Sequence, residues 1–294
     1  MKQLHVAVLM GGPSAEREIS LQSGATAVRA LRSAGARVTE VDVRGADFEL
    51  PDDTDVAFIA LHGTFGEDGQ VQRILDQRGV AYTGSEAEAS ELAFDKCLAK
   101  AALASADILT PRETTQPPLV VKPARQGSSV GVTIVRDRSE LEHAFAEARR
   151  FGEHVICEQF INGRELTVGV LGERALPVIE IHTSRAFFDY TAKYTPGEAK
   201  EIVPAALDRM TTARVQALAQ RAHRCLGCRD VSRVDIILSR SGEMFVLEIN
   251  TVPGMTANSL LPKAARAAGL DMQRVCVRLV ELALARRRFA MATA

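Results

Sequence analysis

The order in which strand and helix patterns follow one another limits the fold of this chain more than any other feature. In the first third the two patterns alternate. The predicted strands are Leu4–Met10, Arg37–Val43 and Val56–Leu61, and the predicted helices are Ser14–Ala34 and Glu67–Gln77. Alternation at this spacing is typical of a parallel sheet with helices on its faces. We therefore predict an N-terminal α/β domain.

The pattern changes after an Ala-rich helical stretch, Glu86–Ala106, which leads into Pro111, Pro117 and Pro118. Strands joined by short turns follow, together with one helix near Ser139–Arg150. These strands are Leu119–Lys122, Gly131–Val135, His154–Phe160, Glu165–Leu171 and Leu176–Ile181. Strands in direct succession favour an antiparallel sheet.

The last third begins with a segment, His182–Val203, that has no sustained periodicity and is predicted to be a long loop. Loops beyond ~12–15 residues inside compact domains are usually functional lids or disordered. A helix at Leu207–Leu226, a hairpin, a polar loop and two terminal helices complete the chain. We predict domains at residues 1–90, 91–180 and 181–294.

Size and charge narrow the class of protein. The chain has 294 residues, 46% of them hydrophobic, which is enough for a substantial core and for two or three domains. The formal net charge of -1 gives no reason to expect nucleic acid or an anionic membrane as partner. The N-terminus does not resemble a signal peptide, and no apolar run approaches the ~18–20 residues that cross a bilayer. We expect a soluble, cytoplasmic protein.

A predicted hairpin brings four polar residues together. They are Arg233, Asp235, Glu248 and Asn250. A tight turn on Ser241-Gly242 makes Asp235 face Glu248 and Arg233 face Asn250. Facing carboxylates, with Cβ atoms ~4.5–5.5 Å apart, repel each other unless a cation compensates them. Carboxylate and amide oxygens suit Mg²⁺ shared with phosphates, so we predict a metal site; the alternative is the solvent-facing side of an amphipathic hairpin.

A second segment has the composition of a phosphate-binding loop. Lys122-Pro123 ends a predicted strand, and a Gly- and Ser-rich loop runs from Ala124 to Gly131. Backbone N–H groups of such a loop can approach a phosphate closely, and Lys122 adds a point charge. A simple hairpin loop is an equal alternative. Neither G-x-x-x-x-G-K-[ST] nor G-x-G-x-x-G occurs, which excludes the Walker and dinucleotide-fingerprint classes.

Two Gly-containing turns follow strands of the predicted parallel sheet. Gly11–Glu16 follows the first strand, and His62–Gly69 follows the third. Ligands of open parallel sheets bind outside the carboxyl ends of the strands, so His62 is well placed. Each turn alone is also explained by turn chemistry and helix capping, whereas two on one edge indicate a shared site.

These motifs together resemble one family. The chain carries, in this order, Gly11-Gly12-x-Ser14-x-Glu16, His62-Gly63-x-x-Gly66-Glu67-Asp68-Gly69, Lys122-Pro123, Gly127-Ser128-Ser129-Val130-Gly131, Arg233-x-Asp235 and Glu248-x-Asn250-x-x-Pro253-Gly254-Met255-Thr256. Over nearly its whole length it closely resembles the D-alanine–D-alanine ligases of the ATP-grasp superfamily. The resemblance implies three domains: a parallel, Rossmann-like α/β domain and two α+β domains that sandwich ATP, the central one shortened.

The resemblance also implies which residues bind the nucleotide and the metal. Lys96 and Lys122 would hold the phosphates, with Ser128 and Ser129 in the loop that covers them. The adenine pocket would be lined by Glu158, Phe160 and Ile161, with Glu165 on the ribose. Asp235, Glu248 and Asn250 would bind two Mg²⁺ ions, with Mn²⁺ as an alternative, which agrees with the hairpin argument.

On the amino-acid side, the resemblance implies that Glu16 takes the ammonium of the first D-alanine, near His62. Ser259 and Leu260 would hold the carboxylate of the second D-alanine, and Lys193 and Tyr194, in the long loop, would close over the site. The family reaction makes an acylphosphate from ATP and then joins it to an amine for cell-wall synthesis. Catalytic roles would fall on Glu16, Ser128, Tyr194, Arg233 and Gly254. The family is usually dimeric, so a homodimer is expected.

The chain departs from the family pattern in two places, and three alternative functions remain open. The segment Arg112–Val121 is shorter than in the family, and Arg73 stands where the family has a small residue, which bears on helix packing at a subunit contact. One alternative is a relative that uses D-lactate as its second substrate; Tyr194 argues against it. The others are an ATP-grasp ligase with another acid and amine, and a silent nucleotide-binding protein. Retained Arg233 and two facing carboxylates argue against the silent protein.

Overall fold

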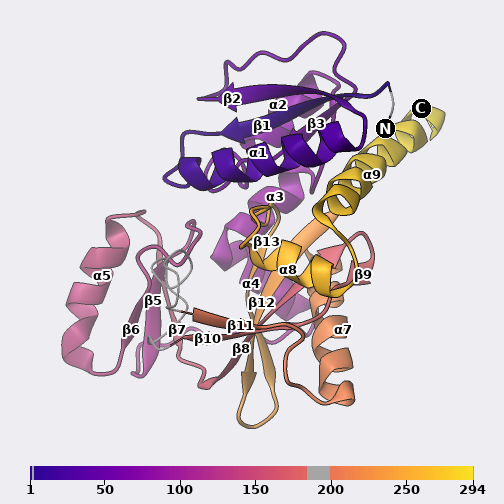
Figure 1. Cartoon of the computed structure of the whole chain (residues 1–294). Helices are drawn as coiled ribbons and strands as arrows, with labels where there is room; N and C mark the ends of the chain where they lie inside the picture. The colour runs from indigo at the N-terminus through magenta and orange to yellow at the C-terminus, as the bar shows by residue number, and fades with distance from the viewer. Residues whose placement is uncertain (2, 184–198, 294) are drawn as a thin grey trace.

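The computed structural model describes residue 1 and residues 3–183 and 199–293, which form three sheets (Figure 1). The first is a parallel sheet with the order β2-β1-β3-β4. Its strands are β1 (His5–Gly11), β2 (Arg37–Val43), β3 (Val56–Ile59) and β4 (Ala81–Tyr82). Helices α1 (Arg17–Ser33) and α2 (Gln70–Gln77) lie in the connections. The predicted alternation of strands and helices is confirmed.

Strand β1 is buried along its whole length because both faces of the sheet are covered. Val6 and Val8 pack into one hydrophobic cluster, whereas Ala7 and Leu9 pack into another on the opposite face. Strands buried on both faces have continuous apolar runs rather than alternating ones. This is why Leu4–Met10 can be recognised as a strand from its sequence.

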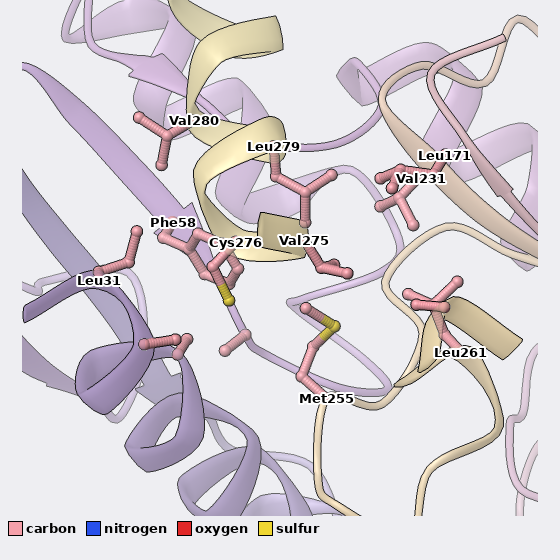
Figure 2. Packing of buried hydrophobic residues seen from close by; sticks show 14 of the residues in the cluster. Leu31, Phe58, Leu171, Val231, Met255, Leu261, Val275, Cys276, Leu279 and Val280 are labelled. Carbon is pink, nitrogen blue, oxygen red and sulfur yellow. The ribbon is translucent and has the colours of Figure 1, made fainter. Parts of the chain in front are cut away.

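The C-terminal helices share a hydrophobic cluster with the parallel sheet. They are α8 (Leu260–Ala267) and α9 (Met272–Thr293), and α9 lies beside α1 in Figure 1. Figure 2 shows the shared core, in which Phe58 of the N-terminal part lies beside Cys276 of the C-terminal part. One continuous hydrophobic cluster therefore fixes the parallel sheet relative to the C-terminal half.

The second sheet is small and antiparallel, with the order β6-β5-β7. It contains β5 (Leu119–Pro123), β6 (Thr133–Val135) and β7 (Val155–Gln159), and it is covered by a 3₁₀ turn at Arg138–Glu140 and helix α5 (Leu141–Arg149). Its core is confined to a few residues: Leu119, Val121, Val135, Ala144 and Ala148. Figure 1 shows this sheet and α5 projecting to one side of the molecule.

The third sheet has the order β11-β10-β8-β12-β13, with β9 paired to β8. Its strands are β8 (Gly163–Leu171), β9 (Arg174–Ala175), β10 (Ile179–Thr183), β11 (Ala199–Ile202), β12 (Val231–Ser239) and β13 (Met244–Asn250). Helices α3 (Ala87–Phe94), α4 (Lys96–Ser105) and α7 (Arg209–Cys225) contribute to its core. The sequence predicted one antiparallel sheet for the middle third, but β8 pairs with β12 along its whole length, so the strands divide between two sheets.

Two further expectations are corrected. The predicted loop His182–Val203 is strand at both ends, because β10 and β11 pair antiparallel; residues 184–198 lie outside the described residues. The single helix predicted at Glu86–Ala106 is broken at Asp95, whose extended backbone ends α3 and whose side chain caps α4. The domain limits at residues 90 and 180 stay a prediction. No helix in the described part of the chain is long and apolar enough to span a bilayer.

Candidate active site

Two cavities meet where the three sheets converge. The first encloses about 950 Å³, including its open part, and the second about 890 Å³. Lys96, Gln126 and Glu248 line both, so the cavities share an edge. We call the first the amino-acid cavity and the second the nucleotide cavity, after the residues predicted for each.

Glu16 reaches the amino-acid cavity from the carboxyl edge of the parallel sheet. The turn after β1 uses positive φ angles at Gly11 (+89°) and Gly12 (+84°), which L side chains rarely adopt. The turn is held by Gly12 N, which donates to Val43 O at 2.7 Å. Ser128 Oγ donates a hydrogen bond to Glu16 Oε1, so the loop of the small sheet contacts the parallel sheet. A carboxylate is thereby oriented at the end of the cavity.

His62 follows β3 and is only 4% exposed. Its Nε2 lies 3.0 Å from Ser23 Oγ, and its Nδ1 lies 3.5 Å from Glu67 Oε1. Burial raises the pKa of Glu67 to about 6, against the lowering effect of the hydrogen bond from His62. Glu67 belongs to a predicted motif but had no predicted role, and Ser23 was not predicted, because neither residue's packing is visible in the sequence.

The hairpin of β12 and β13 carries the predicted metal ligands. Arg233 pairs with Asn250 and Asp235 with Glu248, so the predicted pairings are confirmed. The predicted turn was wrong. Beyond a register shift the partners are Ile236 with Val246 and Leu238 with Met244, and Gly242, with φ +86°, closes a three-residue loop. A β-bulge that leaves out Leu247 restores the predicted register at the site.

The four hairpin side chains are held by polar contacts. Asp235 accepts hydrogen bonds from Thr167 Oγ1 at 2.6 Å and from Arg233 at 2.8 and 2.9 Å. Glu248 Oε2 lies 3.3 Å from Lys96 Nζ, and Asn250 Oδ1 accepts from the N–H of Val252 at 2.9 Å. Asp235 and Glu248 line the nucleotide cavity, and Asn250 lines the amino-acid cavity. The ligand set therefore lies between the cavities.

Two opposed carboxylates and an amide oxygen are hard ligands of the kind that bind Mg²⁺ together with phosphate. Among the described residues, no group of three or more His, Cys, Asp or Glu side chains could hold a metal ion alone. A divalent ion at this hairpin would therefore need oxygens from a substrate as well. The hairpin fits such an ion, and the metal stays a prediction.

The phosphate-binding loop borders both cavities. It follows β5, and Ser128 (φ +51°), Ser129 (φ +58°) and Gly131 (φ +71°) have positive φ angles. Lys96 Nζ donates to the carbonyl of Gln126 at 2.5 Å, which ties the loop to the start of α4. Backbone N–H groups in such a conformation can form an anion-binding concavity.

Lys122, at the end of β5, forms an ion pair with the buried Glu158 of β7. A second lysine, Lys100 of α4, lies 2.7 Å from the other oxygen of the same carboxylate. Burial favours the neutral acid, but the two ammonium groups together hold the pKa of Glu158 below its usual value. Lys100 was not among the predicted residues; its position one helical turn after Lys96 is the signal that could have found it.

The rest of the nucleotide cavity is largely apolar. Phe160, Ile161 and Glu165 line it as predicted for an adenine and ribose site. Aliphatic side chains from four different strands and from the segment between β5 and β6 complete the wall: Val120, Val130, Val132, Ile134, Ile237 and Leu247. Apolar faces of this kind suit a flat base.

The predicted second-substrate residues lie at the start of α8. Ser259 is the N-cap residue, and its Oγ accepts from Thr256 N at 3.1 Å. A Cβ on Gly254 would lie 2.7 Å from Ser259 Oγ, so no larger residue fits there unless Ser259 moves. Gly254, Ser259 and Leu260 all line the amino-acid cavity.

Every predicted site residue that the structure describes lines one of the two cavities. The other two predicted residues, Lys193 and Tyr194, lie outside the described residues. Residues up to 244 positions apart in sequence therefore come together at one edge, since Glu16 and Leu260 line the same cavity.

Models of one protein family match most of the chain. A family model described as "D-ala D-ala ligase C-terminus" matches residues 98–281, and one described as "D-ala D-ala ligase N-terminus" matches residues 33–85. A D-alanine–D-alanine ligase of Methylacidiphilum infernorum is 45% identical over 291 residues, covering 96% of each chain.

Solved structures match over nearly the whole chain. The D-alanine–D-alanine ligase of Bacillus anthracis complexed with ATP has a TM-score of 0.86 at 30% identity, covering 98% of this chain and 99% of that one. The VanG D-Ala:D-Ser ligase of Enterococcus faecalis has a TM-score of 0.85 at 28% identity, covering 96% and 99%. The chain belongs to the D-alanine–D-alanine ligase family and has its ATP-grasp fold.

Proposed function

We propose that this chain uses ATP to join two D-alanine molecules into D-alanyl-D-alanine, releasing ADP and phosphate, for peptidoglycan precursors. The observation that carries the proposal is the shared edge of the two cavities at Lys96 and Glu248. One cavity has charged groups suited to a small amino acid, and the other has apolar walls and lysines suited to a nucleotide. A phosphoryl group can pass between substrates only where such sites meet.

In the nucleotide cavity, Lys96 and Lys122 would hold the phosphates, and the loop N–H groups near Ser128 and Ser129 would cover them. The apolar walls would hold adenine near Phe160 and Ile161. Glu165 would accept hydrogen bonds from the ribose hydroxyls. Positioning of this kind supplies much of the rate in phosphoryl transfer.

Asp235, Glu248 and Asn250 would hold two Mg²⁺ ions, or Mn²⁺ in their place. When bound, such ions offset the negative charge of the transferring phosphoryl group. Arg233 donates to both oxygens of Asp235 and so fixes the orientation of that carboxylate. Thr167 supports the same carboxylate from β8.

In the first step, Glu16 would bind the ammonium of the first D-alanine and leave its carboxylate toward the shared edge. A carboxylate oxygen attacks the γ-phosphorus, a new O–P bond forms, and the bond from the γ-phosphorus to the bridging oxygen breaks, so ADP leaves. Ser128 orients Glu16 by its hydrogen bond to Oε1. The product is an acylphosphate.

In the second step, the amine of the second D-alanine attacks the acyl carbon. Arg233 and the N–H of Gly254 would stabilise the resulting oxyanion, and phosphate then departs with the electrons of the C–O bond and takes up the proton that the attacking nitrogen releases. Ser259 and Leu260 would hold the carboxylate of this second substrate. We propose that Lys193 and Tyr194 close over the site and exclude water from the acylphosphate.

The test is phosphate release from ATP and Mg²⁺ with D-alanine alone, with D-alanine plus D-lactate or D-serine, with L-alanine, and with no amino acid, each product being identified by mass. Phosphate release and the dipeptide mass with D-alanine alone are expected. A product that forms only with D-lactate or D-serine would mean that this compound, and not D-alanine, is the second substrate. D-serine is included because of the structural match to the VanG ligase. Absence of turnover in every arm would refute ligation of these substrates.

We also propose a homodimer that works in the cytoplasm, where ATP is available. Light scattering of the purified chain tests the dimer: a mass near twice the 31.8 kDa of one chain is expected, and a mass near one chain would contradict it.

A further inference from the structure

The nucleotide cavity has a charged group behind its lining that the proposed chemistry does not use. Lys100 Nζ lies 2.7 Å from Glu158 Oε2, and Lys122 binds Glu158 Oε1. Lys122 and Glu158 line the nucleotide cavity, whereas Lys100 is not among the described residues that line either cavity. Lys100 therefore reaches the carboxylate from behind the cavity wall.

These three groups are largely withdrawn from water. The side chains of Glu158 and Lys122 are 3% and 9% exposed, and that of Lys100 is 13% exposed. A buried carboxylate that loses its counter-ion is strongly destabilising. Because Glu158 has two lysines, one of them can leave while the carboxylate stays compensated.

Lys122 is the one that must leave or share its contact, since its ammonium is proposed to hold nucleotide phosphates. We infer that Lys100 is a positioning residue for nucleotide binding, which remains with Glu158 as its counter-ion when Lys122 turns to the phosphates. The inference rests on the proposed role of Lys122 and adds Lys100 to the machinery of the same cavity.

The second lysine–carboxylate pair of the site differs in this respect. Lys96 lies 3.3 Å from Glu248, but Glu248 belongs to the hairpin proposed to bind metal. A divalent ion would compensate Glu248 if Lys96 moved to a phosphate. Glu158 lies among the adenine-pocket residues, away from that hairpin, so Lys100 does for Glu158 what the ion would do for Glu248.

The experiment measures binding of ADP and of adenosine by calorimetry. In Lys100→Met, ADP binding is expected to weaken by at least about tenfold, because Glu158 then competes with the phosphates for Lys122. Adenosine binding is expected to be unchanged, because adenosine does not draw Lys122 away. Lys100→Arg, which keeps the charge, should restore ADP binding. Equal losses for ADP and adenosine would overturn the inference.

Testing Lys100→Met in a second variant shows whether Lys100 positions Lys122 or only supports the structure. In Glu158→Gln there is no buried carboxylate to compete for Lys122, so adding Lys100→Met should cost little further ADP affinity. A tenfold loss that persists in this background would also overturn the inference. If Lys100→Met does not fold, the comparison of Glu158→Gln with the double variant gives the answer, since neither leaves a buried carboxylate unpaired.

The matched control is Arg164→Met. Arg164 pairs with Glu180, another carboxylate that is 5% exposed, at 2.5 Å and away from both cavities. Its loss should lower the melting temperature without weakening ADP binding selectively. None of these binding measurements needs turnover, so a wild-type chain that binds ADP but makes no dipeptide would refute the proposed function and leave this test intact.

Discussion

The two cavities share an edge but are built in different ways. The amino-acid cavity is lined by acidic and basic side chains from all three parts of the chain: Glu16, His62, Glu67, Lys96, Glu201, Arg233 and Glu248. The nucleotide cavity lies between the two antiparallel sheets and has aliphatic walls, with its lysines at the end near the phosphate-binding loop.

The difference follows from the ligands proposed for each cavity. D-alanine has one methyl group and two charges, so there is little apolar surface to bury and its recognition must come from oriented charges. A purine has two apolar faces, so adenine can be held by burial while only the phosphates need charge. We therefore expect that removing a charge in one cavity impairs only the substrate proposed for that cavity. Removing a charge at the shared edge should impair the use of both substrates.

The largest effect is expected at the shared edge. Glu248→Gln removes a predicted metal ligand and the partner of Lys96, so phosphate release with D-alanine should fall by at least about 10³-fold. Glu243→Gln, in the exposed turn of the same hairpin, is the control and should keep full activity. More than a tenth of wild-type turnover in Glu248→Gln would contradict a shared catalytic edge.

Glu16→Gln should separate the cavities. The neutral amide loses the ion pair with the substrate ammonium, so kcat/KM for D-alanine should fall by about 10²-fold while ADP binding stays unchanged. Steady-state kinetics and calorimetry measure the two quantities. The control is Glu18→Gln, in the exposed first turn of the same helix. A parallel loss of ADP affinity in Glu16→Gln would show that the cavities are not independent.

The hairpin illustrates how far the sequence could predict this site. The pairing of Asp235 with Glu248 was predicted from a two-residue turn, yet it arises from a three-residue loop and a bulge at Leu247. The longer loop and the bulge offset each other, so Asp235 still faces Glu248. Two adjacent half-buried residues, Leu247 and Glu248, interrupt the alternation in β13, but only the three-dimensional structure reveals this exposure.

The parallel sheet and the motif residues could be predicted because each depends on local patterns: buried strands, Gly turns, and residue types with definite chemistry. Sheet membership in the middle third could not, since β8 pairs with a strand more than 60 residues away. Lys100 and Ser23 were missed for the same reason. Each acts by touching a residue distant in sequence; Lys100 has only its position one helical turn after Lys96 as a local signal, and Ser23 has no distinctive pattern on its helix.

Two buried carboxylates extend the comparison to pH. Glu158 has two lysines and a lowered pKa, whereas burial raises the pKa of Glu67 to about 6, with His62 Nδ1 at 3.5 Å and Glu16 and Arg233 nearby. From the ordinary value of 4.5, the folded state then binds more protons than the unfolded state between pH 4.5 and 6. Stability from this group is present below pH 4.5 and is lost as the pH rises through about 6.

Glu67→Gln should therefore abolish the loss of folding stability that this carboxyl group causes as the pH rises. The free energy of unfolding of the wild type, measured with urea relative to that of the variant, should decrease by about 2 kcal/mol between pH 4 and pH 8. The contrast with the nucleotide cavity is sharp, because a carboxylate with a lowered pKa gives the opposite sign. A difference between wild type and variant that is constant with pH would mean that Glu67 does not titrate in this range.

The smallest effect is expected at the N-caps of two helices. It tests whether the position of the first turn of α4 determines where Lys96 lies. Asp95 caps α4 by accepting from the N–H groups of Cys97 and Leu98, and Asp208 caps α7 by accepting from Thr211 N. Alanine at either position should cost about 1 kcal/mol of unfolding free energy, the usual value of an N-cap. Helix α4 begins with Lys96 and α7 lines neither cavity, so only Asp95→Ala should also raise KM for ATP. If both variants raise KM for ATP equally, the effect comes from lost stability, and the position of α4 is not what places the lysine at the shared edge.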